Sequence, residues 1–290
     1  MSFSVRRVAV IGAGTMGHGI AQAAAMAGWE TRLTDSRPGA VPQAIAAIGR
    51  NLEGAVTRGK LPPGARDEAL GRITEAASIA EASRDADLVI EAVVEEMDAK
   101  RRVLRAAAGA AAGGALVASN TSSLSIARLA EELPRPERFL GLHFFNPVHL
   151  MKLVEIVVHP GTDAAAREDA LTVVRAMGKE PIVVRDSPGF ASSRLGVALG
   201  LEAMRMVEEG VASPADIDRA MELGYNHPMG PLKLTDLVGL DVRLRIADYL
   251  HQTLGSPRFE PPAILRRLVQ EGKLGKKTGE GFYRWDGPAS

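Results

Sequence analysis

A histidine and a glutamate stand twelve residues apart in the middle of the chain, each within an apolar stretch. His143 closes the run Phe139–His143, and Glu155 lies inside Leu153–Val158. An imidazole has an ordinary pKa of about 6.5, so it exchanges protons readily near neutral pH. A carboxylate on the other ring nitrogen fixes the tautomer and stabilises the imidazolium. This spacing predicts acid–base chemistry, with His143 as the base and Glu155 as its orienting partner.

Each residue of this pair also has an ordinary structural explanation. His143 could be a buried histidine satisfied by a backbone carbonyl. Glu155 could be a surface carboxylate, but its apolar neighbours disfavour this alternative because an unpaired buried charge is costly.

A glycine-rich turn follows the first apolar run of the chain, at Val8–Gly17. In such a turn Gly12 allows the tight bend, Gly14 lets a pyrophosphate approach the backbone, and Gly17 permits close packing of helix on strand. A helix that starts near Thr15 would point its N–H groups at the phosphates. The residues expected to bind a dinucleotide here are Gly12, Gly14, Thr15, Met16 and Gly17. A structural turn without a ligand is the alternative.

Asp35 stands where the second strand of such a unit should end, 23 residues after Gly12. Its carboxylate would accept hydrogen bonds from the adenosine ribose and repel a 2′-phosphate, which favours NAD over NADP. Arg37 favours NADP instead, because a nearby arginine can bind the 2′-phosphate. A redox cofactor together with an acid–base pair indicates an alcohol–carbonyl oxidoreductase.

Length and composition limit the possible classes. The 290 residues suffice for one large or two modest domains. The net charge is zero, so no basic field favours nucleic acid or an anionic membrane surface. The absence of cysteine excludes disulfides, thiolate metal sites and a cysteine nucleophile, and no metal site is predicted. The first strand begins by Val5 and no apolar run approaches about 20 residues, so a cytoplasmic enzyme is expected.

The elements that must position these residues form an α/β pattern followed by helices. Further strands are expected at Asp87–Val94, Ala115–Ser119, Phe139–His143, Leu153–Val158 and Pro181–Arg185. Helical stretches lie between most of them, which predicts a Rossmann-like, doubly wound and mostly parallel sheet. Residues 38–70 are too long for one crossover helix, and Gly59–Gly64 divides them into a helical hairpin.

The pattern changes to helices after Asp186. Ser213 and Pro214 form an N-cap and first-turn pair, and Leu234–Leu254 has apolar residues at helical spacing. We therefore predict a dinucleotide-binding domain at residues 1–186 and a smaller all-helical domain at 187–290.

Six motifs, in this order along the chain, resemble the 3-hydroxyacyl-CoA dehydrogenase family. They are Val10–Gly17, Ser119–Leu124, Gly141–Pro147, Met151–Glu155, Pro228–Pro231 and Gly275–Tyr283. The resemblance is to the single-function bacterial type that acts on 3-hydroxybutyryl-CoA. It implies NAD-dependent oxidation of a short-chain L-3-hydroxyacyl-CoA to the 3-oxoacyl-CoA, or the reverse, in fatty acid metabolism. It also implies a homodimer built through the helical domain, which contributes to the substrate cleft.

The resemblance assigns roles to further residues. Ser122 matches a serine that contacts both substrate and cofactor, and Asn51 and Arg58 match positions that contact coenzyme A. The cofactor-contacting positions are Glu95, Lys100, Asn146 and Lys277. Without the family, Ser122 would pass as a helix N-cap, Glu95 and Lys100 as a solvated charge cluster, and Arg58 and Lys277 as surface residues.

One position departs from the family pattern. Ser193 stands where the family commonly has an asparagine that binds the substrate near its reacting carbonyl. Its hydroxyl still donates a hydrogen bond, but it is shorter than an amide, so substrate preference is open. Two other functions also stay open: a hydroxyacid dehydrogenase without a CoA substrate, such as one acting on L-gulonate, and a non-catalytic NAD-binding protein.

Overall fold

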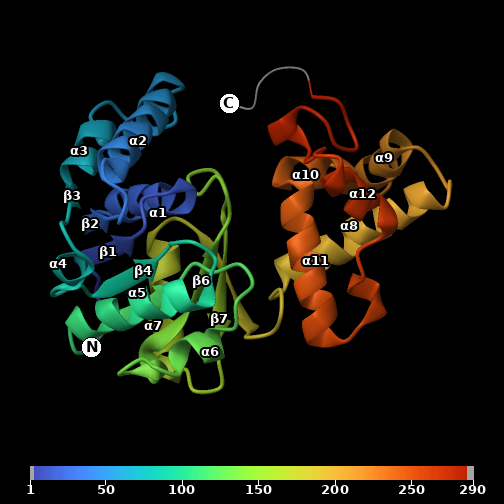
Figure 1. Cartoon of the computed structure of the whole chain (residues 1–290). Helices are drawn as coiled ribbons and strands as arrows, with labels where there is room; N and C mark the ends of the chain where they lie inside the picture. The colour runs from blue at the N-terminus through green and yellow to red at the C-terminus, as the bar shows by residue number, and fades with distance from the viewer. Residues whose placement is uncertain (1–2, 286–290) are drawn as a thin grey trace. The chain divides into compact units, whose positions relative to one another are not determined.

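The computed structural model describes residues 3–285 (Figure 1). Contacts within the chain divide it into two compact units, unit 1 at Met1–Ser187 and unit 2 at Pro188–Ser290. Each unit has its own hydrophobic core of buried side chains. We describe each of them by itself.

Unit 1 is built on an eight-stranded sheet with the strand order β3-β2-β1-β4-β5-β6-β7-β8. The strands are β1 Arg7–Ile11, β2 Glu30–Thr34, β3 Ile73–Glu75, β4 Leu88–Glu91, β5 Leu116–Ser119, β6 Phe139–Phe144, β7 Leu153–Val158 and β8 Glu180–Arg185. Neighbouring strands pair in parallel, except that β7 runs antiparallel to β6. The prediction of a mostly parallel, doubly wound sheet is confirmed.

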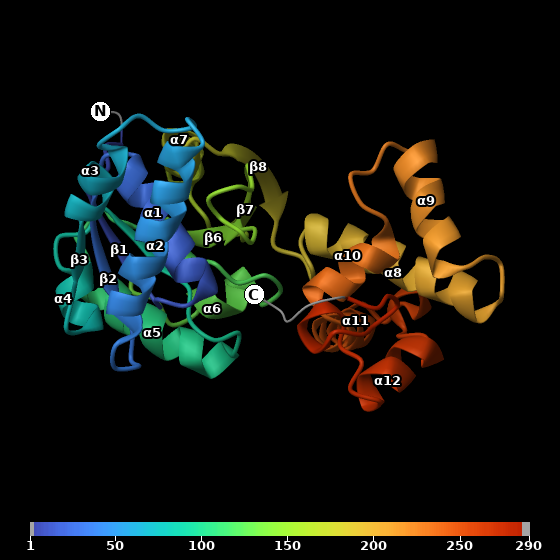
Figure 2. The ribbon, with the colours of Figure 1, turned by 90° about the horizontal axis from the view of Figure 1, so that it is seen from above.

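Helices connect the strands and cover the sheet. They are α1 Thr15–Met26, α2 Ala40–Thr57, α3 Ala65–Gly71, α4 Ile79–Ser83, α5 Met97–Ala110, α6 Ile126–Ala130 and α7 Ala164–Ala176, with a 3-10 turn at Pro136–Arg138. Residues of α1, α2 and α7 join one cluster with alternate strand residues such as Val8 and Val10, while α5 lies across the sheet from α1 (Figure 2). Because both faces are covered, central strands such as Leu88–Glu91 are buried throughout.

The glycine turn after β1 is as tight as the sequence predicts. Gly12 has a φ of 105°, and a Cβ built on it would lie 2.5 Å from the carbonyl oxygen of Ala92. A Cβ on Gly17 would lie 1.7 Å from the carbonyl oxygen of Gly12, so α1 could not pack this closely with any side chain there. A Cβ on Gly14 would meet nothing within 4 Å, so the backbone of the turn faces open space at that residue.

The structure corrects some predicted elements. The strand predicted at Asp87–Val94 ends at Glu91, because the next residue, Ala92, packs against the glycine turn. The sequence missed β3 and α4, which are three and five residues long, since such short elements show no clear periodicity.

Unit 2 consists of α8 Ser192–Glu208, α9 Pro214–Gly224, α10 Pro231–Val238, α11 Leu240–Leu254 and α12 Ala263–Gln270, with 3-10 turns at Pro257–Phe259 and Lys276–Thr278. Ser213 caps α9 as predicted, since its Oγ accepts from the N–H of Asp216. The helical run at Leu234–Leu254 is two helices instead of one, because Gly239 has a φ of 102° and breaks it. Within residues 3–285 no helix is both long and apolar enough to cross a membrane.

Candidate functional site

His143 and Glu155 face each other across two strands. The antiparallel register of β6 and β7 pairs them directly, and cross-strand partners in such a register share one face of the sheet. The Nδ1 atom of His143 and Oε2 of Glu155 lie 2.7 Å apart, and the two side chains are 8% and 0% exposed. The ring of Phe145 packs against the imidazole with 4.5 Å between centroids. The carboxylate at Nδ1 therefore orients the imidazole ring.

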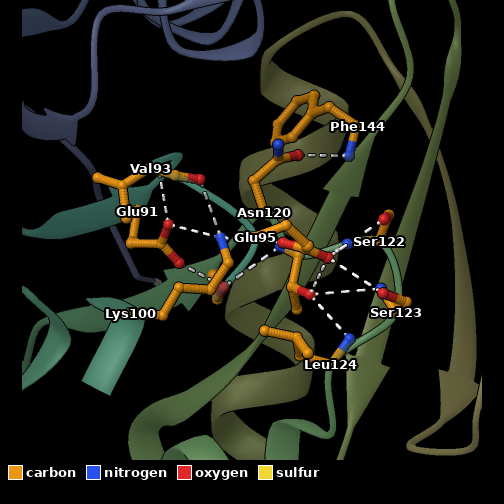
Figure 3. Close-up of polar contacts among 11 residues, drawn as sticks. Glu91, Val93, Glu95, Lys100, Asn120, Ser122, Ser123, Leu124 and Phe144 are labelled. Carbon is orange, nitrogen blue, oxygen red and sulfur yellow. Dashed lines mark hydrogen bonds and ion pairs between the residues drawn. The ribbon is translucent and has the colours of Figure 1, made fainter. Parts of the chain in front are cut away.

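The loop after β5 lies next to the strand that carries His143. The parallel strands β5 and β6 are neighbours, so their carboxyl ends meet at one edge of the sheet. Asn120 joins the loop to this strand, because its Oδ1 accepts from the N–H of Phe144 at 2.9 Å (Figure 3). Ser122 is two residues farther along the loop. It is not a helix cap, since Ser125 caps α6 instead. Asn120 is not among the residues predicted for the site from the sequence.

Glu95 holds this loop through one carboxylate oxygen. Its Oε1 accepts from Thr121 Oγ1 at 2.7 Å, from the Ser122 N–H at 2.9 Å, from Ser122 Oγ at 3.2 Å and from Ser123 Oγ at 3.3 Å. Burial acts to raise the pKa of Glu95, but the charge of Lys100 and these hydrogen bonds outweigh it and hold the pKa below its usual value. Glu95 is therefore an anion that binds the Ser122 loop.

Lys100 and Glu91 form a buried ion pair beside Glu95. Their side chains are 1% and 0% exposed, and Nζ lies 2.7 Å from Oε1 of Glu91 and 3.2 Å from Oε2 of Glu95. A solvated charge cluster, the alternative that we considered for Glu95 and Lys100, is therefore wrong for Lys100. Glu91 is not among the predicted residues, although a charge inside the apolar run Leu88–Ala92 is a signal of a buried ion pair.

A cavity of about 620 Å³ opens at the glycine turn. Its lining comes from the turn, the end of β2, the segment after β4, the segment before α4 and the first half of α5. The lining residues that matter here are Gly12, Gly14, Asp35, Arg37, Ser78, Val93 and Arg102. Ser78 and Arg102 were not predicted from the sequence, because they lie outside the motifs. Open backbone at a helix N-terminus and a carboxylate across the cavity suit the phosphates and the ribose of a dinucleotide.

Asp35 is fixed at the edge of this cavity. It accepts from the N–H of Ala13 at 2.8 Å, and from Arg37 through the backbone N–H at 2.8 Å and Nε at 3.2 Å. Burial acts to raise the pKa of Asp35, but the hydrogen bonds from Arg37 and Ala13 hold it below its usual value. Arg37 is thus paired with Asp35, the carboxylate whose preference for NAD it was expected to oppose.

The other predicted contacts of unit 1 lie around these groups. Thr15 and Met16 begin α1, and Asn146 is exposed three residues after His143, before a cis proline peptide bond. Asn51, on α2, donates through Nδ2 to Oε1 of Gln22 at 3.3 Å, and Arg58 is exposed at the end of the same helix. Their predicted roles stay predictions.

Two predicted residues belong to unit 2. Ser193 is the second residue of α8 and is half-buried. Lys277 lies in the 3-10 turn Lys276–Thr278, and its Nζ donates to Oδ1 of Asp241 at 2.5 Å. Burial acts to raise the pKa of Asp241, but the hydrogen bond and charge of Lys277 hold it below its usual value.

Comparison with known proteins covers nearly the whole chain. Residues 7–187 match the NAD-binding domain of 3-hydroxyacyl-CoA dehydrogenase, and residues 189–285 match the C-terminal domain of the same family. The 3-hydroxybutyryl-CoA dehydrogenase of Bradyrhizobium diazoefficiens is 41% identical over 287 residues, which are 99% of this chain and 98% of that protein.

Solved structures share the fold of the chain. A crystal structure of (S)-3-hydroxybutyryl-CoA dehydrogenase from Ralstonia eutropha matches with a TM-score of 0.94 and 39% identity, covering 98% of this chain and 100% of that one. A diketoreductase that acts on dicarbonyl compounds matches with a TM-score of 0.81 and 31% identity, covering 97% of this chain and 99% of that one.

Proposed function

Since the chain belongs to the 3-hydroxyacyl-CoA dehydrogenase family, it is an NAD-dependent oxidoreductase, and we propose that it interconverts L-3-hydroxybutyryl-CoA, or a close short-chain homologue, and the 3-oxoacyl-CoA. The observation that carries this proposal is the buried pair of His143 and Glu155 beside the Ser122 loop, on the same sheet as the glycine turn. The chain thus has a base for an alcohol proton and a site for a hydride acceptor.

In oxidation, NAD supplies the chemistry of a hydride acceptor at the substrate C3. Nε2 of His143 takes the proton of the C3 hydroxyl as the C3–H bond breaks and its hydrogen leaves as hydride. The C3–O bond thereby becomes a carbonyl. Glu155 then faces a newly formed imidazolium through Nδ1 and stabilises it. In reduction the same imidazolium returns its proton to the carbonyl oxygen.

Several further residues take part in this proposal. Ser122 contacts both the substrate and the cofactor. Glu95, Lys100, Asn146 and Lys277 contact the cofactor. Asp35 binds the adenosine ribose and disfavours a 2′-phosphate, and its pairing with Arg37 supports a preference for NAD over NADP.

The remaining roles concern coenzyme A and the assembly. Asn51 and Arg58 contact the coenzyme A moiety, for which a cation suits the phosphates. Unit 2 supplies Ser193 to the substrate and forms the surface of a homodimer. The enzyme works in the cytoplasm.

Steady-state kinetics on a substrate panel test this function. The panel pairs 3-hydroxybutyryl-CoA and longer 3-hydroxyacyl-CoA esters with free 3-hydroxybutyrate and L-gulonate, each with NAD and with NADP. We expect the highest kcat/KM for a short-chain CoA ester with NAD. A higher kcat/KM for a free hydroxyacid would favour a function without coenzyme A. The panel includes free hydroxyacids because a diketoreductase has the same fold. Turnover with no member of the panel would contradict the proposal.

A further inference from the structure

Four basic side chains of unit 1 gather beside α1, and we call them the basic cluster. They are His18 on α1, Arg58 at the end of α2, His149 in the loop after β6 and Lys179 directly before β8. All the charges that act on His149 are cations. Within residues 3–285, no carboxylate forms an ion pair with any of the four. Like charges repel each other, so a bound anion would stabilise this arrangement.

The loop after β6 packs directly on α1. A Cβ built on Gly19 would lie 2.7 Å from Cβ of Val148, so Val148 occupies the place that a side chain of α1 would take. The residues next to these two in the chain are His18 and His149. Lys179 fixes the same loop, since its Nζ donates to two carbonyl oxygens of the loop at 2.5 Å and 2.8 Å. Packing thus holds His149 beside His18.

Helix α2 brings Arg58 to the same place. α1 and α2 lie side by side (Figure 2), and Nδ2 of Asn51 donates to Oε1 of Gln22 at 3.3 Å, one turn after His18. The guanidinium of Arg58 lies back along α2, since a Cβ built on Gly54 would be 3.2 Å from its Nη1. Residues three, four or seven apart share one face of a helix. The face of α2 that carries Asn51 and Arg58 therefore meets the face of α1 that carries His18.

The basic cluster lies at the edge of the sheet that carries His143. β6 ends one residue after His143, and the loop with His149 follows. Because β7 runs antiparallel to β6 and parallel to β8, β8 begins at this same edge, directly after Lys179. None of the four basic residues lines the cavity at the glycine turn. The cluster thus belongs to the region where Asn51 and Arg58 are expected to contact coenzyme A.

The surroundings of His149 favour proton uptake when an anion binds. Burial lowers the pKa of His149 below its usual value, and the charges of His18, Lys179 and Arg58 lower it further. A phosphate beside the imidazole acts in the opposite direction, because it favours the charged form. Near neutral pH the ring is therefore mostly neutral in the free protein and gains a proton together with the phosphate.

We propose that the basic cluster binds a phosphate of coenzyme A and that its two histidines make this binding tighter as the pH falls. The inference rests on the proposed function, in that the substrate is a coenzyme A ester. Coenzyme A carries a pyrophosphate and a 3′-phosphate, and a charged imidazole adds a charge-assisted hydrogen bond to such a group. The affinity for the substrate then depends on pH independently of the general base His143.

The main test is titration calorimetry of the wild type with free coenzyme A. At pH 7, in two buffers that differ in ionisation enthalpy, we expect the complex to take up about half a proton. The Kd should be about tenfold lower at pH 6.5 than at pH 8.5. Release of protons, or the same Kd at both pH values, would overturn the proposal.

Dephospho-coenzyme A lacks the 3′-phosphate and identifies the phosphate that is bound. If it keeps the pH dependence, the cluster binds the pyrophosphate, and if it loses the dependence, the cluster binds the 3′-phosphate. The same titration with NAD excludes the cofactor as the ligand. A Kd of NAD with the same dependence on pH and on the two histidines would assign the cluster to the cofactor and overturn the proposal.

The double variant His18→Asn with His149→Asn removes the titrating groups. Nδ1 of His18 lies 3.0 Å from the carbonyl oxygen of Gly14, and the asparagine amide offers a donor for the same hydrogen bond. We expect the ratio of the two Kd values to fall from about tenfold to less than about twofold, and the proton uptake to disappear. A ratio that stays at the wild-type value would overturn the proposal.

Arg50→Gln is the matched control, because it removes a positive charge from α2 outside the cluster. Arg50 lines a separate cavity together with Arg66 and Leu70 of α3, so the pH dependence should stay at that of the wild type. A loss of the pH dependence in this control would show that the net charge of the helix is the cause, contrary to the proposal.

A failure to fold and a failure of the proposed function can both be separated from these outcomes. A thermal melt identifies an unfolded double variant, in which case the proton uptake of the wild type and the single variant His149→Asn still decide. Binding of coenzyme A without pH dependence would remove only this inference. A wild type that neither binds coenzyme A nor turns over a 3-hydroxyacyl-CoA would overturn the proposed function as well.

Discussion

Each unit of this protein contains a carboxylate cluster with a buried member, Glu91 in unit 1 and Asp236 in unit 2, and the two clusters differ in what they bind. In unit 1 the Glu91 cluster (Glu91, Glu95 and Lys100) includes a cation and ends on the Ser122 loop. In unit 2 the hydrogen bonds to the Asp236 cluster (Asp218, Asp236, Tyr283 and Trp285) come from neutral donors: backbone N–H groups, a phenol and an indole.

The Asp236 cluster fastens the last segment of unit 2 to its helices. Asp236 accepts from the N–H groups of Phe282 and Tyr283 and from Nε1 of Trp285, all at 2.9 Å. A Cβ built on Gly281 would lie 2.3 Å from Oδ1 of Asp236, so the segment approaches the carboxylate too closely for a side chain there. All these partners are structural. The comparison teaches that a buried carboxylate is identified as part of a site by its partners and not by its burial.

The electrostatics of the two clusters differ in the same way. The pKa of Glu95 is below its usual value because Lys100 and hydrogen bonds outweigh burial. Burial raises the pKa of Asp236, the charge of Asp218 adds to the rise, and hydrogen bonds oppose it only in part. The charges beside the two carboxylates thus act in opposite directions, because the cation Lys100 lowers the pKa of Glu95 and the anion Asp218 raises the pKa of Asp236.

The largest expected effect belongs to unit 1 and concerns turnover alone. His143→Gln should lower kcat between about a hundredfold and ten-thousandfold, because the variant lacks the general base. The Kd of NAD and the thermal midpoint should stay near those of the wild type. Single-turnover kinetics, calorimetry and a thermal melt measure these quantities. Near-normal turnover of the variant would show that His143 is not the general base.

The next effect belongs to unit 2 and concerns stability alone. Asp236→Ala leaves three N–H donors without their acceptor, and should lower the free energy of unfolding by about 3 kcal/mol. Amide hydrogen exchange in unit 2 measures the loss, and kcat per folded molecule should not change. Asp248→Ala is the matched control, because its pair with Arg266 is solvent-accessible and should contribute less than about 1 kcal/mol. Equal losses in both variants would contradict the structural role of Asp236.

A smaller effect would show whether unit 2 contributes to turnover at all. Ser193→Ala should lower kcat/KM by less than about tenfold, because a serine is shorter than the asparagine common in the family and a water-mediated contact contributes about 1 kcal/mol. Ser193→Asn should remain active. Steady-state kinetics on a 3-hydroxyacyl-CoA check both variants. A loss above a hundredfold in Ser193→Ala would indicate direct contact with the reacting oxygen.

The smallest expected effect is a difference in how the two carboxylates, Glu95 and Asp236, change the free energy of unfolding with pH. Glu95 has a lowered pKa, so its stabilisation should be present above pH 4.5, its ordinary pKa, and lost as the pH falls through the lowered value. Asp236 has a raised pKa, so its contribution should be present below pH 3.8 and lost as the pH rises through the raised value. Urea unfolding of the wild type, Glu95→Gln and Asp236→Asn between pH 3.5 and 7 compares the two. Slopes of the same sign would refute the contrast between the clusters.

The amino-acid sequence alone determined the parts of the site that depend on local geometry. The glycine turn, Asp35 after β2 and the cap at Ser213 follow from spacing and backbone sterics, and each lies where it was predicted. His143 and Glu155 were recognised as a pair because two apolar segments carried one polar side chain each.

Only the tertiary structure decided how distant segments meet. The antiparallel direction of β7 brings Glu155 opposite His143, and the burial of Lys100 follows from the packing of α5 beside Glu91. The sequence could not show that Ser125, not Ser122, caps α6, or that Gly239 breaks a helix. Turns and caps depend on a few neighbouring residues, whereas strand register and the burial of a charge depend on contacts between segments that are far apart in the chain.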